Sequence, residues 1–371
     1  MQKEKEKIDF KFIVIIGAAA IITAAVIITL IIIFSGGSEI KSEPEPDEIQ
    51  IINVGLLTTT DGIKSNAAAK ILSALKDGEF SKYIKVDYFE PFAIEDYLPG
   101  LESLARTGHT LIFCAGAELT EAVLTQAVQN SDICYVIMGY IPETAGELPE
   151  NVIGVIYDVY EAVYLTGIIA ANTTRTNKLG IIIGENTPEQ NKYATAFYAG
   201  VLSENPEIEI SGFYMTSFPD SANFAQSIAN QMYSDRNDII FSGAGKADIG
   251  VAVSAYSKNL YAICIDFDLS GGDMLESILV SAVIDYNIIT HDLIRKYLGK
   301  EFNGGKIIQR GIKEGDVDII IPDNEAANQI ISENTINKTE TAKQKIIDGS
   351  VKIPDNETDL LKAFPEINFM K

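Results

Sequence analysis

Short apolar runs rich in Ile, Val and Leu alternate along the chain with longer segments in which apolar residues recur every three or four positions. The short runs are typical of buried β-strands, and the longer segments have the period of amphipathic helices. The pattern predicts strands at residues 51–57, 84–88, 110–114, 134–138, 152–156, 179–183, 208–214, 238–241, 261–265 and 279–283. It predicts helices at residues 66–76, 118–128, 160–172, 193–204 and 224–233.

This alternation favours an α/β fold built from βαβ units, with parallel sheets and helices on both faces. The pattern begins twice, at Asn53 and at Lys178, each time as a strand, a polar or Gly-rich turn and a helix. We therefore predict two similar α/β lobes. Because ligands bind beyond the carboxyl ends of strands in such sheets, two facing lobes would form a cleft that can hinge.

The N-terminus carries the pattern of a membrane anchor. Residues 12–34 contain no charged side chain, and at about 1.5 Å per residue a helix of this length crosses a hydrocarbon core. Lysines precede the run and acidic residues follow it: Lys3, Lys5, Lys7 and Lys11, then Glu39, Glu43, Glu45, Asp47 and Glu48. This bias predicts a single-pass protein of the cell membrane with a cytoplasmic head (1–11), a linker (35–50) and an extracellular or periplasmic body. A cleaved signal peptide is the alternative, since small residues occupy 35–38.

Composition narrows the function of the body. The chain of 371 residues has a net charge of −23, which disfavours nucleic acid and anionic membrane surfaces as partners. Its three cysteines, Cys114, Cys134 and Cys264, lie in apolar strand-like segments and indicate buried thiols rather than a disulfide. A lipoprotein anchor is excluded because no cysteine directly follows the apolar run. No Cys/His spacing indicates a metal site.

No catalytic motif emerges from the sequence. The segment Gly243-Ala-Gly245-Lys246 follows a strand, but Ile240 and Ala247 break a Walker pattern and Asp248 breaks a dinucleotide pattern. Its backbone amides could receive a polar ligand, or the segment could be a plain tight turn. No Gly-x-Ser-x-Gly occurs. The sequence therefore indicates a binding protein rather than an enzyme, with no cofactor.

Several ordered segments carry a family resemblance. They are Asn53-Val-Gly-Leu-Leu-Thr, Leu111-Ile-Phe-Cys-Ala-Gly, Tyr164-Leu-Thr-Gly-Ile-Ile-Ala-Ala, Lys178-Leu-Gly-Ile-Ile-Ile-Gly, Tyr193-Ala-Thr-Ala-Phe-Tyr-Ala-Gly, Asp238-Ile-Ile-Phe-Ser-Gly-Ala-Gly, Ile265-Asp-Phe-Asp and Gly311-Ile-Lys-Glu-Gly-Asp-Val. Together, over residues 51–354, the chain resembles the basic membrane protein family of substrate-binding proteins, which includes purine nucleoside receptor lipoproteins.

The resemblance implies a periplasmic-binding-protein type I fold, in which two Rossmann-like lobes are joined by three crossings of the chain. Lobe 1 would comprise residues 51–157 with 266–296 returning to it, and lobe 2 residues 158–265 with 297–321 returning to it. A helical segment and tail, 322–371, would follow. The implied function is to capture a nucleoside-like or other small polar solute for an ABC permease, without chemistry.

The resemblance also implies a ligand site. The carboxylate that binds ribose hydroxyls falls on Asp266 or Asp268, against the alternative of a turn or cap role. An aromatic ring falls on Tyr193, and the Gly-rich loop falls on Gly243, Gly245 and Lys246. Further cleft residues, in the first strand-to-helix loop and the helix that follows it, are Thr59, Asp61 and Asn66.

The chain also departs from the family pattern. Lys64 and then Asn66-Ala-Ala stand where the family has Asp and then Ser-Phe-Asn, and Ile284 replaces a common lysine. Losing a stacking ring costs about 1–3 kcal/mol. Two readings therefore stay open: a solute-binding component of an importer, or a sensing or regulatory membrane protein that keeps the fold with altered or lost nucleoside binding. An enzyme that uses Asp266 and Asp268 is a third, for which no partner base or nucleophile occurs.

Overall fold

The computed structural model describes residues 51–139, 141, 146–216, 218, 221–267 and 273–370, all within one compact unit, Ile51–Lys371. The predicted head (1–11), anchor (12–34) and linker (35–50) lie outside these residues. Within the described part, every helix is too short or too polar to cross a membrane.

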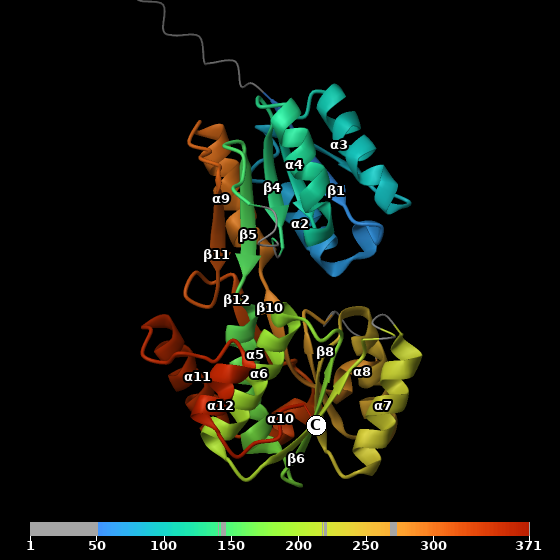
Figure 1. Cartoon of the computed structure of the whole chain (residues 1–371), viewed down its shortest axis with the longest axis vertical. Coiled ribbons are helices and arrows are strands. Elements are labelled where there is room, and N and C mark those ends of the chain that lie inside the picture. Colours follow the sequence, from blue (N-terminus) through green and yellow to red (C-terminus); the bar gives the residue numbers. More distant parts are fainter. Residues whose placement is uncertain are drawn as a thin grey trace, which may run out of the picture. The chain divides into compact units, whose positions relative to one another are not determined.

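The first lobe is built on a six-stranded parallel sheet in the order β11-β5-β4-β3-β1-β2 (Figure 1). Its strands are β1 (Ile52–Thr58), β2 (Ile84–Phe89), β3 (Leu111–Ala115), β4 (Cys134–Met138), β5 (Val152–Tyr157) and β11 (Lys306–Arg310). Its helices are α2 (Asn66–Leu75), α3 (Tyr97–Arg106), α4 (Thr120–Gln129) and α9 (Tyr286–Leu298). Leu56 packs on the face with α2, and Leu57 on the face with α3 and α4, as the alternation of side chains along a strand requires.

The second lobe repeats this plan in the order β12-β10-β9-β8-β6-β7. Its strands are β6 (Lys178–Ile183), β7 (Glu209–Tyr214), β8 (Ile239–Gly243), β9 (Tyr261–Ile265), β10 (Ile278–Ile284) and the antiparallel β12 (Val317–Ile320). Its helices are α5 (Val159–Thr173), α6 (Pro188–Glu204), α7 (Ala222–Ser234) and α8 (Asp248–Lys258). β1 to β5 therefore correspond in order to β6 to β10.

The remaining elements are shorter or lie at the C-terminus. Single 3-10 turns are η1 (Gly62–Lys64), η2 (Ile94–Asp96), η3 (Ala117–Leu119), η5 (Gly245–Ala247) and η6 (Asp273–Ser277). The C-terminal helices are α10 (Glu325–Ile330), α11 (Glu333–Ile347) and α12 (Glu357–Ala363). They pack on the second lobe, α11 against α5 and α12 against α6.

Two glycines explain why α5 and α6 lie so close together (Figure 1). A Cβ on Gly167 would meet the backbone of Phe197, and a Cβ on Gly200 would meet the carbonyl oxygen of Tyr164. The helices can approach to backbone contact only because both positions lack a side chain. Two of the segments that carry the family resemblance are therefore packing motifs of the second lobe.

The ten predicted strands are confirmed, with ends that shift by one or two residues. The sequence pattern missed β11 and β12, because each is a short edge strand with mixed polar and apolar residues. Edge strands of this kind bury too few side chains to require a continuous run of apolar residues.

The chain passes between the lobes three times: between β5 and α5, between β10 and α9, and between β11 and β12. The predicted return to lobe 1 near residue 266 is wrong, because β10 is hydrogen-bonded to β9 and the return comes after Ile284. The segment 297–321 was also misassigned in part. Its first strand, β11, pairs with β5 of lobe 1, and only β12 belongs to lobe 2.

Candidate functional site

The three crossings place the carboxyl ends of the two parallel sheets toward each other. β5 ends where the chain leaves lobe 1, and β10 ends where the chain leaves lobe 2. Because all parallel strands of a sheet end at the same edge, the loops that follow β1, β3, β8 and β9 also face the other lobe. The loops after β1, β8 and β9 carry the predicted ligand residues Thr59, Asp61, Gly245, Lys246 and Asp266.

Asp266 directly follows β9 and is fixed from both lobes. Its φ of 48° is left-handed, and its amide donates to the carbonyl of Ala282 on β10 at 2.6 Å. Its carboxylate accepts from the Lys70 ammonium at 2.5 Å, and its carbonyl accepts from the Asn66 side-chain amide at 2.5 Å. Lys70 and Asn66 belong to α2 of lobe 1, one turn apart. The Asp266 side chain is 15% exposed, so the carboxylate is partly shielded from water.

One tyrosine, Tyr286, lies beside this ion pair. The Lys70 ammonium lies 6.0 Å from the centroid of the Tyr286 ring, and the Tyr157 ring meets Tyr286 edge-on at 5.2 Å. Burial raises the pKa of Tyr286, and the nearby Asp266 and Tyr193 raise it further. Tyr193, on α6, is half-buried against the core, and its pKa is raised by burial and by Glu189 and Asp158. Asp266 and the predicted Tyr193 therefore both lie within electrostatic range of Tyr286.

The Gly-rich loop after β8 is held by one buried carboxylate. Asp248, at the start of α8, accepts from the Ser242 hydroxyl at 2.5 Å and from the Ala244 amide at 2.8 Å. Gly245 has a φ of 61°, which glycine adopts at no steric cost, and the space around its Cβ position is open. Burial raises the pKa of Asp248 to about 7, although both hydrogen bonds lower it.

We expect Asp248 to make the body less stable as the pH rises from about 4 to about 7. Because its pKa of about 7 in the folded protein exceeds the ordinary value of 3.8, the folded state holds the proton longer than the unfolded state, and ionisation over this range disfavours folding. Asp248→Asn should flatten the fall in melting temperature between pH 4 and 7. Asp158→Asn should flatten the fall as well, but only up to about pH 6, because burial raises the pKa of Asp158 to about 6. If the melting temperature of Asp248→Asn changes with pH in parallel with that of the wild type, this account is contradicted.

A second ion pair joins the lobes at a more exposed position. The Lys246 ammonium lies 2.7 Å from the Asp61 carboxylate, and the two side chains are 57% and 36% exposed. Thr59 accepts from the Asp61 amide at 3.5 Å, which is a weak contact. Pairs this exposed are worth about 0–1 kcal/mol.

The predicted residues thus fall into two groups. Asp266 is bound by Asn66 and Lys70, whereas Asp61 pairs with Lys246 at the exposed position and its amide donates to Thr59. Gly243 closes β8 between the side chains of Ile183 and Ile265. Asp268 lies outside the described residues. The sequence pattern missed Lys70. Its position one turn after Asn66 places it on the same face of α2 as that predicted ligand residue, and this spacing could have identified it.

Carboxylates also hold the crossings. Glu161 accepts from the Ile312 amide at 2.8 Å, and Glu314 accepts from the Gly311 amide at 3.0 Å. The Arg310 guanidinium donates to Asp316 at 2.7 Å, and the Asp316 side chain is fully buried. The segment between β11 and β12 is therefore tied to both lobes by charge-assisted hydrogen bonds, which are stronger than neutral ones.

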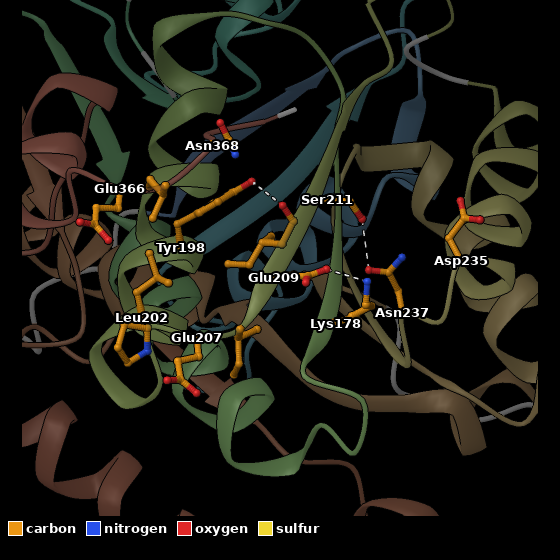
Figure 2. Close-up of a pocket in the computed structure, with 14 residues that line it drawn as sticks. Lys178, Tyr198, Leu202, Glu207, Glu209, Ser211, Asp235, Asn237, Glu366 and Asn368 are labelled. Carbon is orange, nitrogen blue, oxygen red and sulfur yellow. Dashed lines mark hydrogen bonds and ion pairs between the residues drawn. The ribbon is translucent and has the colours of Figure 1, made fainter.

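Figure 2 shows a separate hollow of about 660 Å³ in the second lobe. It is lined by the first residues of β6 and β7 and by the C-terminal segment, with Lys178 paired to Glu209 at 2.6 Å and Ser211 bonded to Asn237 at 3.1 Å. It lies at the amino ends of β6 and β7, whereas Asp266 follows the carboxyl end of β9, at the opposite edge of the sheet.

The described residues contain no group of three His, Cys, Asp or Glu side chains that could hold a metal ion. Of the two histidines, His109 is buried with Nδ1 2.9 Å from the Leu104 carbonyl. His291 lies 3.2 Å from the Ala74 carbonyl and packs edge-on against Phe80. Neither histidine is hydrogen-bonded to Asp266, whose partners among the described residues are Lys70, Asn66 and Ala282.

Two similar α/β lobes joined by three crossings define the two-lobed fold of the periplasmic-binding-protein type. The solved structure of an ABC transporter solute-binding protein from Conexibacter woesei shares this fold, with a TM-score of 0.69, 15% identity and coverage of 82% of this chain and 99% of that chain.

The family follows from the sequence comparison. Residues 63–357 match the model of the PnrA-like ABC transporter substrate-binding proteins, and the chain belongs to this family. Basic membrane protein A1 of Borrelia garinii is 30% identical over 276 residues, which cover 73% of this chain and 79% of that protein. The CD4+ T-cell-stimulating antigen of Listeria monocytogenes is 28% identical over 284 residues, which cover 72% and 77%. The resemblance inferred from the ordered motifs is confirmed.

Proposed function

We propose that this protein is the membrane-anchored, extracytoplasmic solute-binding component of an ABC-type importer, and that it holds a nucleoside-like or other small polar solute between its lobes. Asp266 carries the proposal, because it stands at the carboxyl edge of the second sheet and is contacted from the first lobe through Lys70 and Asn66. A solute that bridges the lobes would meet donors and acceptors from both.

The ion pair between Lys70 and Asp266 suits a hydroxylated solute. A carboxylate has about four acceptor sites and an ammonium has three donors, so the pair can stay intact while it binds hydroxyl groups that both donate and accept. Tyr286 offers aromatic surface beside it, with its ring centroid 6.0 Å from the Lys70 ammonium. In this arrangement Lys70 supplies the cleft with a positive charge. The family commonly has a lysine at the position of Ile284, so Lys70 would take over the role of that missing cation.

The second candidate is a sensing or regulatory protein, and the same ion pair favours it. The carboxylate expected to bind the solute already has a partner in Lys70 at 2.5 Å. If Lys70 occupies the hydrogen-bonding sites of Asp266 that a solute would use, the protein keeps its fold without binding a ligand.

A thermal-shift screen of the body, residues 51–371, separates the two candidates. The panel contains nucleosides, free bases, sugars and amino acids. Because a ligand that binds only the folded state adds about 2.7 kcal/mol at a hundred times its Kd, a true solute raises the melting temperature clearly. The importer function predicts a shift with hydroxylated solutes. A flat response across the panel would leave the regulatory candidate.

A further inference from the structure

The outer edge of the first sheet, strand β2, is open to a further strand. β2 is the last strand in the sheet order and pairs only with β1. The Tyr83 carbonyl accepts from the Ile52 amide at 2.9 Å, so the backbone groups of Tyr83 point toward β1. Because this direction alternates along a strand, the backbone groups of Ile84, Val86 and Tyr88 point away from the sheet. In the part of the chain that the structure describes, no residue outside β1 is hydrogen-bonded to the backbone of Val86 or Tyr88.

The equivalent edge of the second sheet, strand β7, is covered by the chain itself. The Ile210 carbonyl points away from β6 by the same alternation and accepts from the Tyr198 hydroxyl at 3.3 Å. That hydroxyl accepts the Met370 amide at 3.1 Å, and a Cβ on Gly212 would meet the Met370 backbone. Native proteins usually cover an edge strand, because its free backbone groups can pair with another chain. The fold therefore covers one of its two equivalent edges and leaves β2 free.

The residues of β2 are complementary to themselves in antiparallel pairing. If a two-fold axis passes through Val86, the outward backbone groups of Val86 meet those of Val86 in a second copy. Lys85 of each copy then lies opposite Asp87 of the other, and Ile84 lies opposite Tyr88. The Lys85 and Asp87 side chains are 67% and 47% exposed, so both are accessible to a second copy. They fall at a non-hydrogen-bonded pair, in which opposite Cα atoms are only about 4.5 Å apart.

Charge selects this register over its neighbours. Moving the axis by one residue toward the amino end places Lys85 opposite Lys85, and moving it by one residue toward the carboxyl end places Asp87 opposite Asp87. Opposite charges across an antiparallel pair are stabilising, whereas like charges are destabilising. Only the axis at Val86 joins unlike charges on both sides of the two-fold, as a self-complementary interface of two identical copies requires.

Exposed apolar side chains surround the same edge. Tyr83 before the strand and Tyr88 within it are each 42% exposed, and Phe92 and Ile94 after it are 99% and 69% exposed. The Phe92 amide donates to Asp96 at 3.1 Å, which fixes the loop that presents the ring. Antiparallel pairing brings the amino end of one β2 beside the carboxyl end of the other, so Tyr83 of each copy approaches the Phe92 loop of its partner. Clustered exposed aromatic side chains are typical of protein interfaces.

We propose that two copies of this chain form a dimer through antiparallel pairing of their β2 strands, with the two-fold axis at Val86. The pairing joins the two six-stranded first sheets into one continuous sheet. β5 and β11, where the chain crosses to the second lobe, lie at the other side of the first sheet. The dimer therefore leaves the crossings and the second lobe of each copy uncovered, and it does not depend on the proposed importer function.

Reciprocal charge reversal in the full chain tests the register. Two copies with different affinity tags are expressed together, and the fraction that copurifies from detergent-solubilised membranes is measured. Lys85→Asp in both copies, or Asp87→Lys in both copies, should lower copurification at least fivefold, because like charges then face each other. Lys85→Asp in one copy with Asp87→Lys in the other should restore it, because every pair again joins a carboxylate and an ammonium. Glu209→Lys on the equivalent strand β7 is the matched control and should change nothing.

Disulfide crosslinking in native membranes gives a second, independent readout. Val86→Cys lies on the proposed axis and should form a covalent dimer on oxidation. Tyr83→Cys is exposed but would lie about 20 Å from its copy, six residues along the strand, and should stay at the level of the unmodified chain. Circular dichroism confirms that each variant folds. Wild-type copies that do not copurify, copurification that the charge reversals leave unchanged, or equal crosslinking at positions 83 and 86 would overturn the proposal.

Discussion

Asp316→Ala is expected to lower the free energy of unfolding of the body by about 3–5 kcal/mol. The Asp316 side chain is fully buried and the Arg310 side chain is only 17% exposed, and two hydrogen-bonding contacts join them. Removing the carboxylate leaves the guanidinium shielded from water without its counter-charge. Asp316 also accepts the Asp285 amide through its carbonyl at 2.7 Å, so the pair lies where two of the crossings meet.

Urea unfolding of the wild type and the variant measures this effect. The matched control is Asp61→Ala, which breaks the exposed pair with Lys246 and should cost about 0–1 kcal/mol. A second variant, Arg310→Met with Asp316→Leu, removes both charges and should recover much of the loss, since an apolar pair of similar volume is often neutral. Equal costs for Asp316→Ala and Asp61→Ala would contradict the role assigned to the buried pair.

Asp266→Ala is expected to weaken binding of the solute tenfold or more, which corresponds to about 1.4 kcal/mol. Under the proposed function the carboxylate accepts hydrogen bonds from the solute, and its loss removes the anionic partner of Lys70. Tyr193→Ala should weaken binding by a similar factor, because under the proposed function its ring packs against the solute. Titration calorimetry with the solute from the thermal-shift screen measures both changes.

Lys70→Met tests whether the ammonium takes part in recognition. It keeps the length of the side chain and removes the charge, so a bound hydroxyl would lose a donor while α2 stays intact. Circular dichroism of each variant confirms folding. If Asp266→Ala and Tyr193→Ala both bind the solute as the wild type does, the site does not lie around Asp266.

The fold was predictable because buried parallel strands and amphipathic helices leave strong periodic signals. Ten strands and the repeated plan followed from apolar runs alone, whereas β11 and β12 did not, because edge strands expose one side and mix polar with apolar residues. The point of return to lobe 1 was misplaced for a related reason. Nothing local in β10 indicates which of two similar sheets it joins.

The site was predictable only in part. Asp266 follows a strand, so its position at a sheet edge could be inferred, but Lys70 appears in the sequence as an ordinary helix lysine. Its contact with Asp266 joins residues 196 positions apart, and only the placement of α2 against the second lobe produces it. Long-range pairs of this kind have no periodic signal.

Spin labels on the two lobes test the central claim most directly. Val128→Cys on α4 and Lys258→Cys on α8 place one label on each lobe at exposed positions. The native Cys114 and Cys264 are buried and should label poorly; burial also raises the pKa of Cys134 to about 11. If solute sits between the lobes, adding the compound that raises the melting temperature will change the distance distribution between the labels. An identical distribution at saturating solute would contradict an interlobe site.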